Sequence, residues 1–297
     1  MRVLVTGAAG LLGGRLATLL SRRFDVVAGR HESPVPARLA ETPIDLASPA
    51  AIERALDAAR AEAVVHAAGI ADPDRCERDP DLASRLNTGG CEELARLCHA
   101  RSLPLVALST DLVFSGERPF LTESDAPQPQ QVYGRTKLAG EQALLALHPA
   151  SAIVRVALVM GRGHGPRATA SEAVAWALRA GRRPRLFTDQ HRTPIDAESV
   201  ARLVERLLAG KESGIFHAGG AERLSRFDLG LRTARLLGLA PEAIEAVTQA
   251  ALAQPARRPA DVSLDSTKAQ RLLGWSPRPL EAGILEGRPA ADDPAND

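Results

Sequence analysis

The sequence predicts an α/β protein with a Rossmann-type, doubly wound parallel sheet and a smaller C-terminal lobe. Its first half alternates short β-branched runs with Ala- and Leu-rich stretches of helical period, an order typical of parallel sheets with helices on both faces. A glycine-rich turn directly follows the first of these runs. The 297 residues, 45% of them hydrophobic and 25% charged, suit one large domain or a main domain with a smaller appendage.

Five runs of β-branched and apolar residues are expected to form the main strands, and Pro43 with Ile44 is expected to form a further short one. Stretches with apolar residues at helical spacing lie between them. The expected strands span residues 3–6, 25–28, 63–67, 105–109 and 153–156, and the expected helices span 11–22, 49–59, 80–101 and 133–147.

From about Gly161 onward the pattern loosens, because helical pieces are separated by Pro- and Gly-rich loops. We expect residues 1–160 to form the sheet domain and residues 161–286 to form the smaller lobe, partly interleaved with the last sheet elements. The polar residues 287–297 are expected to be a disordered tail. The helical pieces of the lobe cover residues 171–180, 197–208 and 225–237.

Composition argues against several classes of partner. The net charge is +1 and charges of both signs alternate, so neither nucleic acid nor a membrane surface is expected to bind. No apolar run approaches the ~18 residues that span a bilayer, and no signal peptide is expected at the start. Cysteines at positions 76, 91 and 98 lack metal-type spacing, which favours reduced thiols and a cytoplasmic location.

Glycines follow the first expected strand at a spacing that suits a dinucleotide. Gly7, Gly10 and Gly13 form a G-x-x-G-x-x-G pattern where the strand passes into a helix. Glycine permits the tight turn and the close approach of a pyrophosphate, whose charge the first helical amides, around Leu11 and Leu12, would meet. The alternative is that the glycines form a turn with a purely structural role. The position of the glycine pattern between a strand and an amphipathic helix favours cofactor binding.

Arg30 follows the second expected strand, where NAD-selective sites usually carry an acidic residue for the ribose 2′-hydroxyl. A guanidinium can accept a 2′-phosphate, so we expect NADPH as cofactor and NADH as the alternative. The competing interpretation is a solvated Arg30, with Glu32 binding the ribose. Asp45 and Leu46 follow the short strand, where Asp45 can hydrogen-bond an adenine amino group or simply cap the next helix.

The fourth expected strand ends in small residues beside a histidine. Ala67, Ala68 and Gly69 leave room for a cofactor ribose. His66 is expected to pack rather than to bind a ligand. This segment is therefore a second expected contact of the dinucleotide.

Tyr133, the only tyrosine of the chain, is followed four residues later by Lys137, one of three lysines. This spacing places the phenol and the ammonium one turn apart on the same face of a helix. A cation beside a phenol favours the phenolate and lowers the pKa of tyrosine from about 10 toward the range that acid/base chemistry requires. A surface Tyr-Lys pair is the alternative if the pair is taken alone.

Several ordered motifs accompany this pair. They are Ser109-Thr110-Asp111-Leu112-Val113-Phe114-Ser115-Gly116, Glu123 with Asp125, Tyr133-Gly134-Arg135-Thr136-Lys137-Leu138-Ala139-Gly140-Glu141, Asp189-Gln190 with Thr193-Pro194, and Arg258-Pro259-Ala260-Asp261. Together they resemble the extended short-chain dehydrogenase/reductases, and within them the dTDP-4-dehydrorhamnose reductase type. The resemblance covers roughly residues 1–285.

The resemblance implies an oxidoreductase whose first domain binds the dinucleotide and whose C-terminal lobe binds a nucleotide-sugar substrate. Tyr133 would be the acid/base, Lys137 would hold the nicotinamide ribose, and Thr110 would hydrogen-bond the substrate carbonyl. A hydride that arrives at a carbonyl leaves an alkoxide, which needs such donors. Asp111 would touch the substrate or brace the loop, and Arg192 would meet a substrate diphosphate or lie in a solvated loop.

Three positions depart from the patterns of related families. Sugar-nucleotide dehydratases carry an acid where this chain has Leu112, so elimination of water is not expected. Some rhamnose-forming reductases bind magnesium through a glutamate where this chain has Arg15, so no metal is expected. Leu158 stands where an aromatic residue can line the sugar pocket. Asn87 lies in an expected helix, where the fold often uses an asparagine to order the site, although a surface position is the alternative.

The resemblance favours an NADPH-preferring reductase of a nucleotide-linked 4-keto sugar, with dTDP-4-dehydro-L-rhamnose as the first candidate. One alternative is a dinucleotide-binding regulatory subunit that resembles the β subunit of methionine adenosyltransferase. The other is a nucleotide-sugar epimerase, which should keep NAD tightly bound, and Arg30 argues against it. The oligomeric state stays open, with a homodimer as one arrangement.

Overall fold

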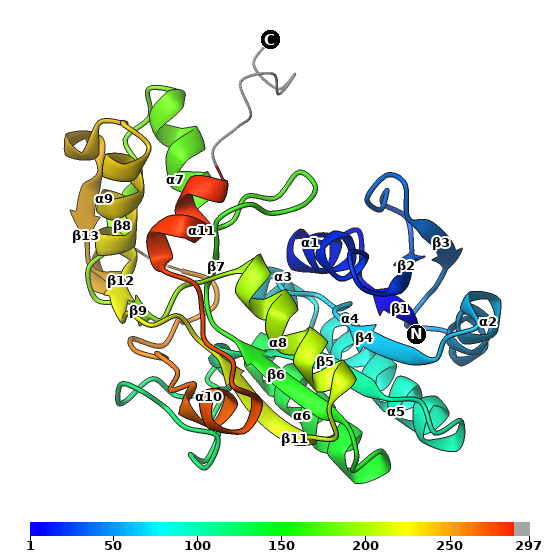
Figure 1. Ribbon diagram of the computed structural model, residues 1–297. Coiled ribbons are helices and arrows are strands. Elements are labelled where there is room, and N and C mark those ends of the chain that lie inside the picture. The colour runs from blue at the N-terminus through cyan, green and yellow to red at the C-terminus, as the bar shows by residue number, and fades with distance from the viewer. Residues whose placement is uncertain (253, 288–297) are drawn as a thin grey trace.

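A seven-stranded sheet forms the centre of the computed structural model, which describes residues 1–252 and 254–287 (Figure 1). Its strands are β1 (Arg2–Thr6), β2 (Asp25–Arg30), β3 (Ala40–Pro43), β4 (Ala63–His66), β5 (Leu105–Thr110), β6 (Ala152–Val156) and β11 (Gly214–Ala218). They lie in the order β11-β6-β5-β4-β1-β2-β3, and every neighbouring pair is parallel. The predicted α/β class with a doubly wound parallel sheet is therefore confirmed.

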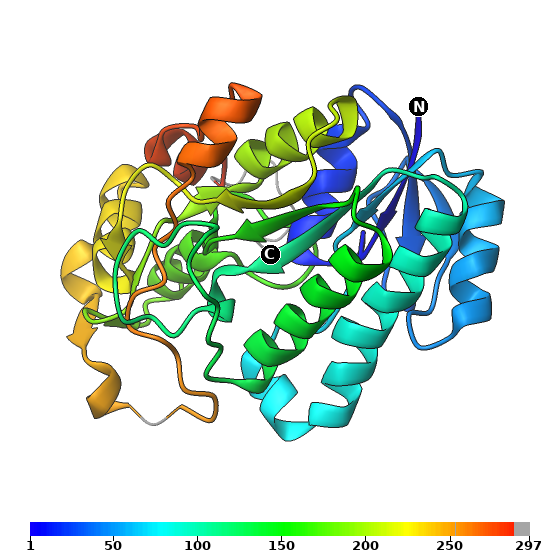
Figure 2. The same ribbon diagram turned by 90° about the horizontal axis from the view of Figure 1, so that it is seen from below.

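Helices cover both faces of this sheet (Figure 2). Successive strand residues point to opposite faces, so Leu4 and Val5 of β1 belong to two different hydrophobic cores. The helices that bury these cores are α1 (Leu11–Leu20) and α8 (Ala197–Ala209) on the Val5 side, and α2 (Pro49–Ala59), α5 (Gly90–Ala100) and α6 (Val132–Leu147) on the Leu4 side.

The five main predicted strands and most predicted helices are present, with ends shifted by one or two residues. The helix predicted over residues 80–101 is present over residues 80–100, but it contains a π-helical turn, η1 (Arg85–Gly89), between α4 (Pro80–Ser84) and α5, which was not predicted. Such turns are rare and occur mostly inside α-helices, so the apolar pattern alone indicates one continuous helix. The short strand β3 also lies earlier than the predicted pair Pro43 and Ile44.

The C-terminal half contributes β11 to the main sheet and a second group of elements at one end of the molecule (Figure 1). There α7 (Ala170–Arg179) packs against α9 (Arg226–Leu236). The division near residue 160 stays a prediction, and the predicted tail, apart from Gly287, lies outside the described residues. The shorter elements are α3 (Pro73–Arg78), η2 (Asp111–Val113), β7 (Val159–Met160), β8 (Arg185–Phe187), β9 (His191–Arg192), β10 (Ile195–Asp196), β12 (Leu224–Ser225), η3 (Pro241–Ala243), β13 (Glu245–Val247), η4 (Gln249–Ala251), α10 (Thr267–Leu273) and α11 (Leu280–Glu286).

Because all strands of the seven-stranded sheet are parallel, the carboxyl ends of β1, β2, β4 and β5 meet at one edge of this sheet. Ligands of doubly wound folds bind at this edge. In the described part of the chain, no helix combines the length and the apolar character needed to cross a membrane.

Candidate active site

The glycine turn between β1 and α1 packs directly on the loop that follows β4. Gly7 has φ +69°, and a Cβ on it would lie 2.6 Å from the Ala67 carbonyl. A Cβ on Gly13 would lie 2.2 Å from the Gly7 oxygen, so the start of α1 also needs glycine there. No side chain among the described residues caps α1 at Gly10, which leaves the first helical amides, including that of Leu11, as donors for an anion.

Gly7→Ala is expected to destabilise the fold by more than about 1 kcal/mol and to weaken dinucleotide binding, because alanine disfavours this φ and its Cβ would strike the Ala67 carbonyl. Gly89→Ala is the matched control, because Gly89 has φ −61° and a Cβ there would meet no atom within 4 Å. Thermal unfolding and dinucleotide titration of both variants measure the difference. Equal behaviour of the two variants would contradict this account of the turn.

A second chain segment lies against the glycine turn and was not predicted to do so. The His164 amide donates to the Leu11 carbonyl at 3.0 Å, and the His164 ring occupies the space where a Cβ on Gly14 would stand. The loop between β7 and α7 therefore closes over the start of α1. The contact between this loop and α1 joins residues about 150 positions apart in the sequence. No local sequence pattern could therefore have predicted it.

The expected adenosine end of the site lies at β2 and β3. The Arg30 Nε donates to Glu41 Oε1 at 3.0 Å, and both side chains are exposed. Asp45 accepts from the Ala47 amide at 2.9 Å, whereas Ser48 caps α2. The interpretation of Asp45 as the helix cap is therefore wrong, because Asp45 closes the turn that precedes the cap.

The end of β4 is tied to β1 by a buried histidine. The Thr6 hydroxyl and His66 Nδ1 lie 2.8 Å apart, and the same hydroxyl accepts from the Ala68 amide at 3.3 Å. Burial, and then the nearby Lys137 charge, lower the pKa of His66 to about 3, so its imidazole is neutral. A Cβ on Gly69 would lie 2.5 Å from Asn87 Oδ1, so this loop approaches η1 closely.

Asn87 is buried and connects this loop to α6, so the surface alternative is excluded. Its side chain accepts from the Ile70 amide at 2.8 Å and donates to the Ile70 carbonyl at 3.2 Å. The same amide group donates to the Thr136 hydroxyl at 3.1 Å. Asn87 lies in the π turn, a feature frequent at functional sites, and it fixes α6 next to β4.

The structure brings together Thr110, Tyr133 and Lys137, which the sequence placed on two elements. Thr110 ends β5, and its hydroxyl lies close enough to the Tyr133 phenol to lower the phenol pKa. The Lys137 ammonium is buried and donates to the Leu108 carbonyl at 2.8 Å. A Cβ on Gly134 would lie 2.2 Å from the Leu112 oxygen, so glycine is what lets α6 approach η2, the turn that follows β5, this closely.

The environment of Tyr133 corrects one expectation. Burial raises the pKa of the Tyr133 phenol above its ordinary value, the nearby Thr110 hydroxyl lowers it, and the Asp111 charge raises it further. The net direction is opposite to the one expected from the Lys137 charge. The phenol is therefore protonated at neutral pH and is not a phenolate.

Asp111 and Arg192 lie next to this pair and face each other inside the protein. Arg192 Nε is 3.8 Å from Asp111 Oδ2, and both side chains are almost fully buried. Arg192 also donates to the backbone carbonyls of His191 at 2.6 Å and Pro259 at 3.1 Å. The solvated-loop interpretation of Arg192 is therefore wrong. Arg226, in the first turn of α9, lies near both charges. Burial lowers its pKa to about 10; the Arg192 charge lowers it as well, and the Asp111 charge raises it.

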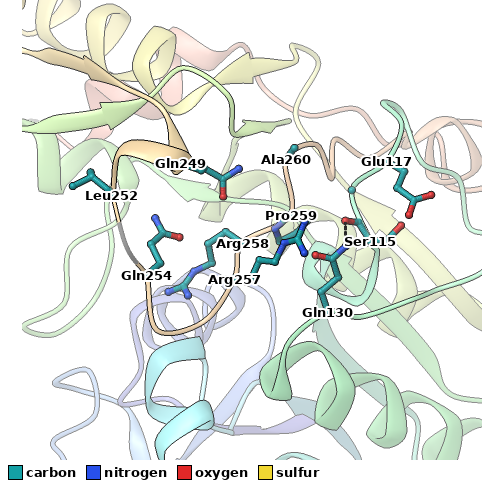
Figure 3. Close-up of a pocket in the computed structure, with 11 residues that line it drawn as sticks. Ser115, Glu117, Gln130, Gln249, Leu252, Gln254, Arg257, Arg258, Pro259 and Ala260 are labelled. Carbon is teal, nitrogen blue, oxygen red and sulfur yellow. Dashed lines mark hydrogen bonds between the residues drawn. The ribbon is translucent and has the colours of Figure 1, made fainter.

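A cleft of about 510 Å³ opens next to Pro259 and Ala260 (Figure 3). One wall is the loop after η2 and the other is the segment that leads into residues 258–260, whose Pro259 carbonyl holds Arg192. The size suits a drug- or nucleotide-sized ligand. The cleft is lined by Ser115, Gly116, Glu117, Gln130, Gln249, Leu252, Gln254, Arg257, Arg258, Pro259 and Ala260.

Arg15, which stands where some related reductases bind magnesium, forms an ion pair with Glu286 of α11. Within the described residues, no group of His, Cys, Asp and Glu side chains is arranged to hold a metal ion. The guanidinium of Arg15 thus joins the glycine-turn helix to the last helix of the chain.

A family model, the RmlD substrate binding domain, matches residues 1–287. The chain belongs to this family. It is 36% identical to the dTDP-4-dehydrorhamnose reductase of Streptomyces griseus, over 97% of this chain and 93% of that protein. It is 34% identical to the probable low-salt glycan biosynthesis reductase Agl14 of Haloferax volcanii, over 99% of each.

Two further similar proteins bear on the alternatives. Subunit beta of methionine adenosyltransferase 2 from Mus musculus is 29% identical over 96% of this chain and 86% of its own length. The crystal structure of a hypothetical dTDP-4-dehydrorhamnose reductase from Sulfolobus tokodaii matches with a TM-score of 0.82 and 30% identity, over 95% of this chain and 98% of that chain. The relatives thus include proteins named as reductases and a protein named as a subunit of methionine adenosyltransferase.

Proposed function

We propose that this protein is an NADPH-preferring reductase that converts a nucleotide-linked 4-keto sugar, dTDP-4-dehydro-L-rhamnose, to dTDP-L-rhamnose. The observation that carries the proposal is the pair of hydroxyls of Thr110 and Tyr133, beside the buried Lys137 ammonium, at the edge where the glycine turn lies. Such a pair supplies the donors that a carbonyl needs when it receives a hydride. The relatives named as reductases support the same reaction.

The residues take the following parts in this proposal. The nicotinamide, when bound, supplies the hydride. Tyr133 gives its proton to the alkoxide, Thr110 orients the carbonyl oxygen, and Lys137 holds the nicotinamide ribose. The glycine turn fits the pyrophosphate, because its positive φ at Gly7 and its uncapped amides form an anion site. The remaining proposed cofactor contacts are Leu11, Leu12, Asp45, Leu46, Ala67, Ala68 and Gly69.

The substrate part of the proposal rests on charge. Arg192 would meet the diphosphate, and the cleft beside it would take the nucleotide. A cytoplasmic location and a homodimer are further parts of the proposal.

Oxidation of NADPH by the purified protein, followed in absorbance with a panel of nucleotide 4-keto sugars, tests the reaction. Activity with none of them would refute it.

The adenosine end gives a testable preference. Arg30→Ala is expected to weaken NADPH binding by about 1.5–3 kcal/mol, the usual worth of a hydrogen bond to a charged group, and to leave NADH binding nearly unchanged. Glu41→Gln should act in the opposite direction, because its carboxylate holds Arg30 at 3.0 Å and would repel a 2′-phosphate. Calorimetric titration of both cofactors measures this. Equal losses for NADPH and NADH in Arg30→Ala would contradict the assignment.

A second function has one observation in its favour, the likeness to the methionine adenosyltransferase subunit. A regulatory subunit would bind the dinucleotide and a partner protein without turning over NADPH. Retention of Thr110, Tyr133 and Lys137 in one buried group favours catalysis. A preparation that binds an adenosyltransferase but oxidises no NADPH with any 4-keto nucleotide sugar would favour the regulatory function.

A further inference from the structure

Asp111 is a buried carboxylate whose two oxygens have different surroundings. Its Oδ1 accepts from the Thr110 hydroxyl at 3.2 Å. Its Oδ2 is buried, has no hydrogen-bond partner among the described residues, and lies 3.8 Å from Arg192 Nε. The charged and titratable groups that face it are Arg192 of β9, Arg226 of α9 and Tyr133 of α6.

The only proton of the Thr110 hydroxyl is already engaged in this arrangement. A threonine hydroxyl has one proton to donate and two lone pairs that accept. It donates to Asp111 and accepts from the Leu112 amide at 3.2 Å. The Thr110 hydroxyl, one of the two proposed donors to a substrate carbonyl, is thus turned to another acceptor in the protein alone.

Resting on the proposed function, we propose that Asp111 is a positioning residue that takes up one proton when the substrate diphosphate engages Arg192. Protonated Asp111 donates to Thr110 and reverses that hydrogen bond. The Thr110 proton is then free to point to the substrate carbonyl. The proton comes from solvent, and no bond other than these hydrogen bonds changes.

The direction of the proton follows from the charges. Burial raises the pKa of Asp111 to about 6, and the Arg192 charge keeps it from rising further, so the carboxyl is ionised at pH 7.5. A diphosphate brings negative charge next to Asp111 and shares Arg192, and both effects raise the pKa of Asp111 again. Above pH 6 binding is therefore coupled to proton uptake, and below about pH 5 it is not, since Asp111 is already protonated.

Calorimetric titration with dTDP-glucose tests the proposal, because this probe has no keto group and its phosphates do not titrate near neutral pH. The protein is saturated with NADP⁺ and measured at pH 7.5 in buffers of different ionisation enthalpy, which gives the number of protons taken up. We expect about 0.5–1 proton for the wild type and close to none for Asp111→Asn, whose amide can donate to Thr110 without a proton. The wild-type affinity should fall by up to about tenfold per pH unit above pH 6, and that of Asp111→Asn should stay flat.

The outcomes separate this inference from the proposed function. If the wild type does not bind dTDP-glucose, the proposed function fails and the inference with it. If it binds with no proton uptake, or if Asp111→Asn takes up as many protons as the wild type, the inference alone is overturned. Should Asp111→Asn not fold, Arg192→Gln replaces it. That variant removes the cation that holds the pKa of Asp111 down, so the uptake at pH 7.5 should shrink, and an unchanged uptake would refute the inference.

Discussion

Tyr133→Phe is expected to lower the turnover of NADPH by about 10²–10⁴-fold, which is the usual contribution of a positioned proton donor. The variant removes one hydroxyl and keeps the buried ring, so its fold should be preserved. NADPH binding should also be preserved, because the glycine turn and Lys137 do not depend on the phenol. Steady-state kinetics, cofactor titration and circular dichroism of the same preparation measure the three properties.

A matched pair at Thr110 serves as the control for this result. Thr110→Ser keeps the hydroxyl that donates to Asp111, and Thr110→Val removes it at nearly equal volume. If the hydroxyls act on the carbonyl, the valine variant should lose activity as Tyr133→Phe does, whereas the serine variant should keep most of it. A Tyr133→Phe variant that works at the wild-type rate would overturn the enzymatic proposal.

The pKa of the Tyr133 phenol can be measured directly, because Tyr133 is the only tyrosine in the chain. Ultraviolet titration of the protein without cofactor should place the phenol pKa above its ordinary value, as burial dictates. Bound NADP⁺ should lower it, because the nicotinamide ring carries a positive charge. A phenol that titrates identically with and without NADP⁺ would show that the cofactor ring does not reach Tyr133.

Local chemistry explains why much of the site was predictable from sequence. The turn at Gly7 and Gly10 needs only neighbours in the chain, and the four-residue spacing from Tyr133 to Lys137 is a property of one helix. The position of Thr110 at the end of β5 follows from the strand pattern and from the parallel topology. The resemblance then brought these separate elements together, and the packed structure agrees.

Features that depend on distant contacts were not predictable in the same way. The π turn around Asn87 is stabilised by Ile70 and Thr136, which come from a loop and from another helix. The pKa of Tyr133 is set by burial, and a four-residue spacing cannot report burial. The enclosure of Arg192 by Pro259 requires a segment more than sixty residues away, so its side chain looked like part of a loop.

A buried ion pair between α6 and β6 is another contact between distant residues that the sequence did not predict. Glu141 belongs to a matched motif with no role implied for its side chain, and Arg155 of β6 belongs to none. In the structure Arg155 Nη2 lies 2.7 Å from Glu141 Oε2, with both side chains almost fully buried. The Ser109 hydroxyl donates to the same carboxylate. This group joins α6, which carries Tyr133, to β5 and β6.

Glu141→Gln is expected to destabilise the protein by about 3–5 kcal/mol, because it leaves the Arg155 charge buried without a counter-ion. The control is Glu93→Gln, which breaks a helix-surface pair with Arg96 and should cost far less, because Arg96 is exposed to solvent. Chemical denaturation of both variants gives the two free energies of unfolding. Similar losses for the two would contradict the importance of burial here.

The double variant Glu141→Leu with Arg155→Met separates charge from packing. Breaking the pair from one side leaves an unpaired buried charge, whereas replacing both partners by apolar residues removes the desolvation cost altogether. The double variant should therefore be more stable than the Arg155-containing Glu141→Leu single variant, and the two single losses should not add. Strict additivity would mean that Glu141 and Arg155 do not interact. In that case α6 would be held to β5 by its apolar face and by the Asn87 contacts, with no share from the buried charges.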